Sequence, residues 1–169
     1  MQLGYYDNFP SNIHHAEIYS SIVSIKQLQL RLIRVLGDLN LKEFTFEDIA
    51  IPTIPCGRVI FEFGLAESGG FNFIDEAEVK KALAFLSKGA VHSLDFFCSI
   101  RYYKENAEKR IALKFDYYML RVLLSRGSFE VRISHERGPR YVSPQELSSF
   151  IAAKVNEAAG KKILREQAT

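Results

Sequence analysis

The chain has 169 residues, of which 47% are hydrophobic and 25% are charged, and its formal net charge is +2. This length is close to that of one domain, and the composition is ordinary for a globular protein. A chain of this size can bury roughly two thirds of its unfolded surface, so it needs no disulfide or metal to stabilise it. The longest unbroken apolar run, Ala82–Leu86, has five residues and excludes a membrane-spanning helix. The N-terminus lacks the basic and apolar stretches of a signal peptide, and we expect a cytoplasmic protein.

Charge is unevenly distributed along the chain. Residues 42–99 carry five Lys and Arg against nine Asp and Glu, whereas residues 100–141 carry ten against five and are rich in tyrosine. Such an asymmetry can mark a nucleic-acid partner. Ion pairing within the protein or on its surface is the simpler alternative.

The first half of the chain alternates between strand-like and helix-like patterns. β-branched and aromatic residues favour strands, capping boxes mark two helix starts at Ser24 and Asp75, and apolar residues at helical spacing follow each cap. The predicted elements are a strand over 12–23, a helix over 24–39, strands over 43–51, 58–66 and 71–74, and a helix over 75–89.

The second half predicts three long strands and a helix. The predicted elements are strands over 93–104, 110–124 and 128–135, and a helix over 143–160. The short connections at 105–109 and 125–127 indicate an antiparallel meander. The last helix has a complete start signal, because Ser143 is a cap, Pro144 follows at the first helical position and Glu146 completes the box.

This order of elements predicts an α+β fold with helices packed on one face of a mainly antiparallel sheet. The first six elements, βαββαβ, match a ferredoxin-like arrangement, which a hairpin and a C-terminal helix would extend. The alternative is a strongly curved sheet that grips the C-terminal helix and leaves a pocket between them. Residues 1–160 are expected to form a single domain, and residues 161–169 a frayed tail.

Alternation along the last three strands assigns their side chains to the two faces of the sheet. The faces expected toward the helices carry Leu94, Phe96, Cys98, Ile100 and Tyr102, then Ile111, Leu113, Phe115 and Tyr117, then Phe129, Val131, Ile133 and His135. The opposite, free face is then expected to carry Arg101, Tyr103, Lys114, Asp116, Tyr118, Glu130 and Arg132.

The basic and tyrosine side chains of this free face form a candidate binding site. Arg and Lys contact phosphates and tyrosine rings stack on bases, which would suit nucleic acid. The loop after the last strand adds two further cations near a helix N-terminus. The predicted binding residues are Arg101, Tyr103, Lys114, Tyr118, Arg132, Arg137 and Arg140. A protein partner, self-association, or a solvated face with cross-strand ion pairs are the alternatives.

No catalytic motif stands out, and the sequence predicts neither a metal nor a cofactor. Cys56, in a loop beside a glycine, could be an exposed nucleophile, but it has no recognisable partner. Asp95, Asp116 and Glu130 could gather on one sheet face for acid–base chemistry, although neighbouring Lys and Arg make ion pairing the simpler account. A non-enzymatic binding module is therefore the first hypothesis. The second is a small-molecule enzyme or carrier with a pocket between the C-terminal helix and the sheet.

Overall fold

A computed structural model describes residues 3–54 and 57–167. Cys56, which was considered as an exposed nucleophile, lies outside the described residues. The helices found there are α1 (Ile25–Leu39), a short 3-10 helix (Phe46–Asp48), α2 (Glu76–Leu86) and α3 (Pro144–Ala159). The strands are β1 (His15–Ser21), β2 (Glu43–Thr45), β3 (Gly57–Glu67), β4 (Gly70–Phe73), β5 (Ser93–Asn106), β6 (Lys109–Ala112), β7 (Asp116–Ser125), β8 (Ser128–Arg137) and β9 (Leu164–Glu166).

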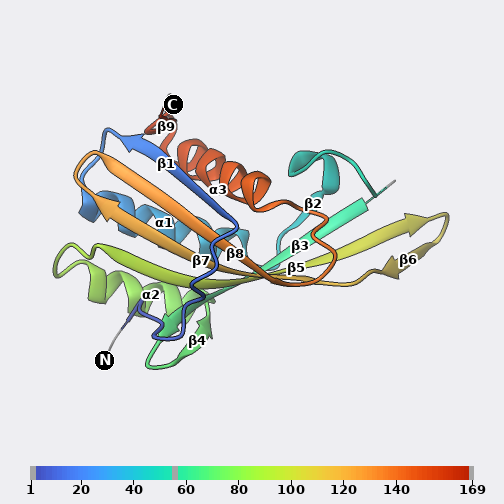
Figure 1. The fold of residues 1–169 in the computed structure, drawn as a ribbon, viewed down its shortest axis with the longest axis horizontal. Coiled ribbons are helices and arrows are strands. Elements are labelled where there is room, and N and C mark those ends of the chain that lie inside the picture. Colours follow the sequence, from blue (N-terminus) through green and yellow to red (C-terminus); the bar gives the residue numbers. More distant parts are fainter. Residues whose placement is uncertain (1–2, 55–56, 168–169) are drawn as a thin grey trace.

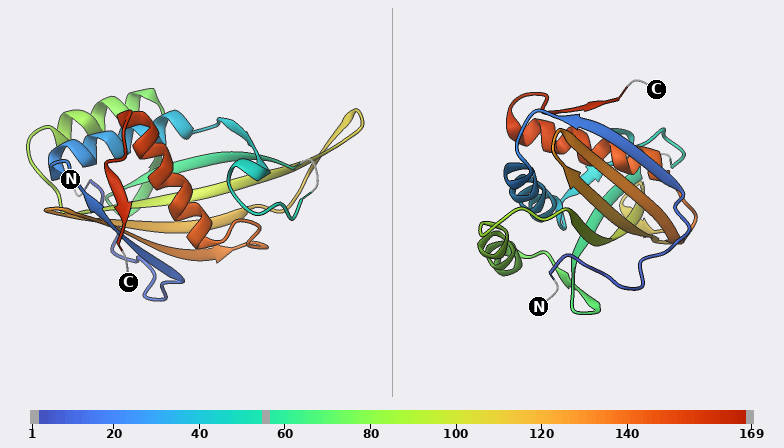
Figure 2. Two further views of the ribbon diagram at one scale, coloured as in Figure 1. Left: turned by 90° about the horizontal axis from the view of Figure 1, so that it is seen from above. Right: turned by 60° about the vertical axis from the view of Figure 1, so that its left-hand side comes forward.

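All of these strands join one twisted sheet, with three helices on one of its sides (Figures 1 and 2). The strand order is β2-β3-β5-β7-β8-β1-β9, with β4 added to β3 and β6 added to β5. Each of the pairings between these strands is antiparallel. The predicted α+β class and antiparallel meander are therefore confirmed.

The ferredoxin-like order is not confirmed, because a split βαβ unit contains parallel strands and β1 here pairs with β8 and β9. β1 and β2 are separated by four strands in the sheet, which is about 24 Å at the usual spacing of strands. α1 has 15 residues, and a helix of that length spans about 22 Å. The helix between them can therefore carry the chain across the sheet, a path that the order of elements alone does not reveal.

The predicted helix starts are confirmed by their caps. The Ser24 and Asp75 side chains accept the backbone N–H groups of Gln27 and Glu78, and Ser143 forms a reciprocal capping box with Glu146. Each cap satisfies donors that the first turn of a helix leaves open, and thereby fixes where the helix begins.

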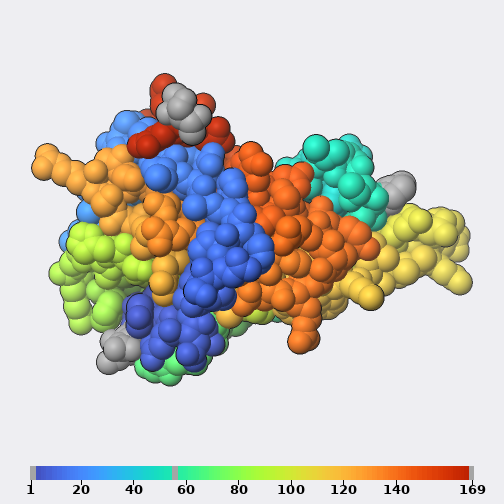
Figure 3. Space-filling model, viewed as in Figure 1, coloured from blue at the N-terminus to red at the C-terminus, as the bar shows by residue number. Residues whose placement is uncertain are grey.

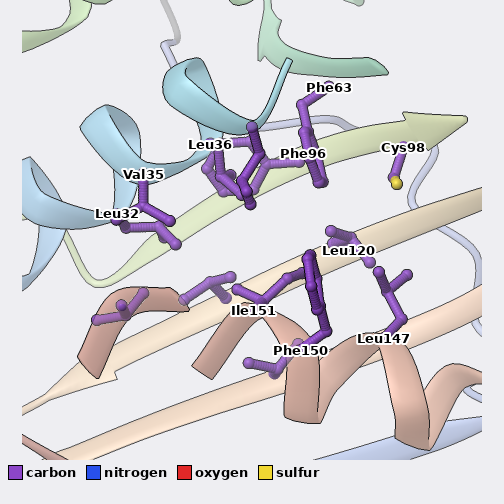
Figure 4. Packing of buried hydrophobic residues seen from close by; sticks show 14 of the residues in the cluster. Leu32, Val35, Leu36, Phe63, Phe96, Cys98, Leu120, Leu147, Phe150 and Ile151 are labelled. Carbon is purple, nitrogen blue, oxygen red and sulfur yellow. The ribbon is translucent and has the colours of Figure 1, made fainter. Parts of the chain in front are cut away.

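The core fills the space between the helices and the sheet. Figure 4 shows side chains of α1 and α3 directed toward the same strands. Phe150 of α3 stacks on Phe61 of β3, with 5.2 Å between the ring centroids. The inner residues of α3, Leu147, Ile151 and Val155, are buried. The space under the middle of α3 is thus occupied by side chains, and a cavity of about 810 Å³ lies instead beside its N-terminal half, against the loop at Ile49–Thr53.

One hairpin leaves the body of the protein. β5 continues past the helices and pairs with β6, and the two strands form an arm that projects from one end of the molecule (Figures 1 and 3). Ion pairs of Arg58 and Arg110 with Glu43 and Glu105 connect the arm to β2 and β3 on one face. Such exposed pairs contribute little to stability singly, so the arm is held mainly by its backbone pairing.

The C-terminal residues differ from the prediction of a frayed tail. Leu164–Glu166 forms β9 on the edge of β1, and the Asn156 side chain accepts the N–H groups of Ile163 and Leu164. Both apolar residues are buried, which explains why this segment is ordered.

Across residues 3–54 and 57–167, no helix has the length and apolar character needed to cross a bilayer.

Candidate functional site

The face of the sheet opposite the helices, the free face, carries a row of aromatic rings. Phe71 of β4, Phe97 of β5 and Tyr117 of β7 are joined by Phe115, and we call these four residues the aromatic row. Ring centroids are 5.9 Å apart from Phe71 to Phe97, 5.8 Å from Phe97 to Tyr117 and 6.1 Å from Tyr117 to Phe115. All four rings are half-buried, so each is supported by the sheet and still exposed to solvent.

A bulge at the start of β7 brings two of these rings to the free face. Ala112 lies opposite Tyr103 and Asp116 lies opposite Ile100, so the second strand has one residue more than β5 over this stretch. After an extra residue, each following side chain points to the face opposite to the one that alternation predicts. The faces predicted from alternation are right as far as Lys114 and wrong for Phe115, Asp116, Tyr117 and Tyr118.

Tyr118 shows the consequence of this exchange. It was predicted on the free face, but it lies among the helix-facing side chains and is fully buried. Its hydroxyl donates a hydrogen bond to the backbone oxygen of Val142 at 2.5 Å. Burial raises the pKa of Tyr118 above its usual range, so the hydroxyl stays protonated and serves as a donor inside the protein.

Asp116 moves to the helix side through the same bulge, and it organises the turn that follows β8. Its carboxylate is fully buried. It accepts hydrogen bonds from the hydroxyl of Tyr102 at 2.5 Å and from Nε2 of His135 at 2.8 Å. It also accepts the backbone N–H groups of Arg140 at 2.6 Å and Tyr141 at 2.9 Å. A single carboxylate thus fixes the position of the turn at residues 138–141.

Gly138 allows this turn to lie against the bulge. Its φ of +112° suits glycine, and a Cβ at this position would lie 2.2 Å from the backbone oxygen of Phe115. The close approach forms a pocket of about 630 Å³ at the end of the aromatic row. The pocket is lined by Lys114, Phe115, Tyr117, Arg137, Gly138 and Pro139.

Three cations surround this end of the row. Lys114 and Arg137 line the pocket, are exposed, and form no ion pair with any carboxylate among the described residues. The guanidinium of Arg101 lies 5.4 Å from the centroid of the Phe115 ring and also pairs with Glu62. The structure therefore brings together three of the predicted binding residues around rings that lie on the free face.

The remaining predicted residues lie elsewhere. Tyr103 is on the arm beneath the guanidinium of Arg110, which is 5.1 Å from its ring centroid. Arg132 is on the free face of β8 and pairs with Glu130. Arg140 is exposed and borders the cavity beside α3 instead of the pocket at the row.

The opposite end of the row is covered by the N-terminal segment, residues 3–13, which crosses the free face before β1 (Figure 1, dark blue). The ring of Tyr6 packs on the ring of Phe71 with centroids 4.7 Å apart. Gly64 makes room for this arrangement, because a Cβ there would lie 3.1 Å from Cβ of Phe71. In the space-filling view the segment lies on the same side as β8 and its following turn (Figure 3).

Asp95 anchors this segment. Its fully buried carboxylate accepts the backbone N–H of Tyr6 at 2.8 Å and pairs with Arg121 on the neighbouring strand at 2.7 Å. The Arg121 guanidinium also lies 4.4 Å from the centroid of the Phe9 ring. The hydrogen bond from Arg121 to Asp95 is the largest cause of the raised pKa of Arg121. Because Asp95 binds the backbone N–H of Tyr6, the N-terminal segment is attached to the sheet through its backbone.

The carboxylate cluster considered as an alternative to ion pairing does not form. Asp95 and Asp116 lie on opposite faces of the sheet, and Glu130 pairs with Arg132. Within the described part of the chain, no group of three or more His, Cys, Asp and Glu side chains converges as metal ligands would. Burial raises the pKa of the Cys98 thiol well above its usual range, so this cysteine is not poised as a thiolate nucleophile.

Comparisons with protein-family models, with curated proteins and with solved structures found no match. Function is therefore inferred from the residues of the site alone.

Sequence reasoning missed all four rings of the aromatic row. Phe97 lies between Phe96 and Cys98 of the helix-facing set, so alternation places it on the free face, but it was not counted as a binding residue. Phe71, Phe115 and Tyr117 were not recognised as its neighbours. The sequence offered no signal for the extra residue, because both faces of β7 carry apolar side chains.

Proposed function

We propose that this protein binds single-stranded nucleic acid through the aromatic row and the cations at its open end. The observation that carries the proposal is the run of Phe97, Tyr117 and Phe115 at centroid spacings of 5.8 and 6.1 Å, next to Arg101, Lys114 and Arg137. Solvent-exposed rings on a sheet are stacking platforms for unpaired bases, and cations beside them contact the phosphates between those bases.

The geometry favours unpaired over paired strands. Bases in a duplex are stacked on each other and cannot lie flat on rings that belong to the protein, whereas each base of a single strand has an available face. Stacking is also independent of sequence, so we expect weak discrimination among bases. The pocket between Phe115 and Pro139 would hold one base with its phosphate near Lys114 and Arg137.

Fluorescence anisotropy with labelled single- and double-stranded DNA and RNA over a range of salt tests this proposal. We expect Phe97→Leu together with Tyr117→Leu to weaken single-strand binding roughly tenfold or more, because each base–ring stack contributes about 1–3 kcal/mol. We expect Lys114→Ala together with Arg137→Ala to weaken binding and to reduce the salt dependence by about one to two phosphate contacts.

Arg132→Ala is the matched control for the charge change. This residue is an arginine on the same face but away from the row, and it is already paired with Glu130. Its removal should leave both affinity and salt dependence nearly unchanged. Absence of single-strand binding at low salt, or equal losses in the control and in the Lys114 and Arg137 variant, would overturn the proposal.

A second candidate is a small-molecule carrier that uses the cavity of about 810 Å³ beside α3. The observation in its favour is a lining that combines apolar groups such as Ile49 and Phe150 with polar groups such as Arg140 and Glu146. A thermal-shift screen of small anions and aromatic acids distinguishes the two candidates. A ligand that raises the melting temperature, with the effect lost in Phe150→Ala and retained in Tyr117→Leu, would favour the carrier.

A protein partner and self-association both stay predictions. The side chains of Ile18 in β1 and of Ile22 just after it are among the exposed apolar groups that a second chain could cover.

A further inference from the structure

The aromatic row is open at one end and closed at the other. At the open end, Phe115 and Tyr117 face a pocket that contains no other ring of the described residues. At the closed end, the Tyr6 ring packs on Phe71, in the position that the next base of a bound strand would take. The row thus has four rings, and the Tyr6 side chain of the N-terminal segment covers the last of them, Phe71.

The position of the Tyr6 ring is fixed by its backbone and not by its side chain. Its N–H donates to Oδ2 of Asp95, its backbone oxygen accepts from Nη2 of Arg121 at 3.4 Å, and Gly4 is hydrogen-bonded to both β3 and β5. The ring itself is half-buried and contributes no polar contact among the described residues. A substitution of the ring can therefore leave the segment docked.

From these contacts we infer that Tyr6 is a built-in substitute for a base, which ends the stacking site and sets the length of single strand that the protein accepts. This inference rests on the proposed function. A strand entering from the pocket stacks over Phe115, Tyr117 and Phe97, and then meets the Tyr6 ring where it would continue onto Phe71. The protein therefore binds short unpaired stretches or strand ends, and gains nothing from further nucleotides on that side.

The test measures affinity against length with single strands of uniform sequence, from about two to twelve nucleotides. For the unmodified protein, affinity should stop rising at about three to four nucleotides, because three rings are open. In Tyr6→Ala the rise should continue by about one to two nucleotides, and the longest strands should bind roughly tenfold more tightly than they bind the unmodified protein.

Tyr5→Ala is the matched control. Tyr5 is the neighbouring residue of the same segment, is 47% exposed, and lies by the Arg121 guanidinium and not on the row. Its removal should leave the length dependence unchanged. Thermal melting of both variants checks that the fold persists, and amide exchange at residue 6 checks that the segment stays docked on Asp95.

The possible results separate the two proposals. If the unmodified protein binds single strands and Tyr6→Ala reaches its plateau at the same length, Tyr6 does not end the site, and the proposed function stands without it. A lengthened plateau in Tyr5→Ala as well would show that loosening of the segment, and not the Tyr6 ring, sets the length. If the unmodified protein binds no strand of any length, the proposed function fails and the role of Tyr6 fails with it.

Discussion

Two segments without regular structure lie at the two ends of the aromatic row, and each is held by a buried aspartate. The turn at residues 138–141 is held by Asp116, and the N-terminal segment is held by Asp95. Both carboxylates are fully buried and both accept backbone N–H groups of the segment that they hold. The other partners differ, because Asp116 is surrounded by Tyr102 and His135, whereas Asp95 is paired with an arginine.

This difference in partners indicates which of the two segments is released from the sheet more easily. Of the two side chains that bind Asp116, Tyr102 is fully buried and His135 retains 9% exposure, so little water can replace the carboxylate if it is lost. Arg121 retains 23% exposure of its side chain, so it can be solvated without Asp95. The turn is therefore part of the rigid frame of the pocket, while the N-terminal segment is the more easily released of the two.

The largest effect is expected from Asp116→Ala. The substitution leaves four donors without their shared acceptor, and it should lower the free energy of unfolding by about 3–4 kcal/mol. Urea denaturation measures this change. Asp38→Ala, at an exposed position of α1, is the control and should cost less than about 0.5 kcal/mol. Equal midpoints for the two variants would show that Asp116 does not hold the turn.

A smaller effect is expected from Asp95→Ala. It removes the acceptor for Arg121 and Tyr6, but water can reach the arginine, so we expect a loss of about 2 kcal/mol. Amide exchange should show faster exchange at residues 4–9 than at residues 138–142. If this variant is less stable than Asp116→Ala, the ranking of the two anchors is reversed and the comparison is wrong.

The smallest effect is expected from Arg132→Ala. Its side chain is 42% exposed and its partner Glu130 lies on the same strand, so the pair should contribute within about 0.5 kcal/mol. Thermal or urea unfolding of the variant measures this. A loss comparable to that of Asp95→Ala would mean that the charges of the free face act as a network and not as separate pairs.

Local signals in the sequence predicted the local structure well. The caps at Ser24, Asp75 and Ser143 were placed correctly because each depends on residues within one helical turn. The helix-facing set of β5, from Leu94 to Tyr102, is buried as alternation predicted. Where the local pattern changed, the prediction lost accuracy: residues 43–51 form only the short β2 and a 3-10 helix.

The site depended on contacts that local patterns do not contain. One extra residue near Phe115 exchanged the faces of Tyr117 and Tyr118, and hydropathy alone cannot detect it because both faces of β7 carry apolar side chains. The segment around Tyr6 has no periodicity, so its docking on Asp95 follows only from the folded sheet. Of the seven predicted binding residues, Arg101, Lys114 and Arg137 meet at the row, because they flank the bulge and the turn.

The pairing of β1 with β8 also determines the order in which the chain can fold. β1 lies near the start of the sequence, but both of its neighbours, β8 and β9, lie in the last quarter. While the protein is being synthesised, β1 has no partner in the sheet until β8 has left the ribosome. Contacts between such distant parts of a chain slow folding and prolong the exposure of apolar strands. The first strand to be made is therefore among the last to be covered by its neighbours in the sheet.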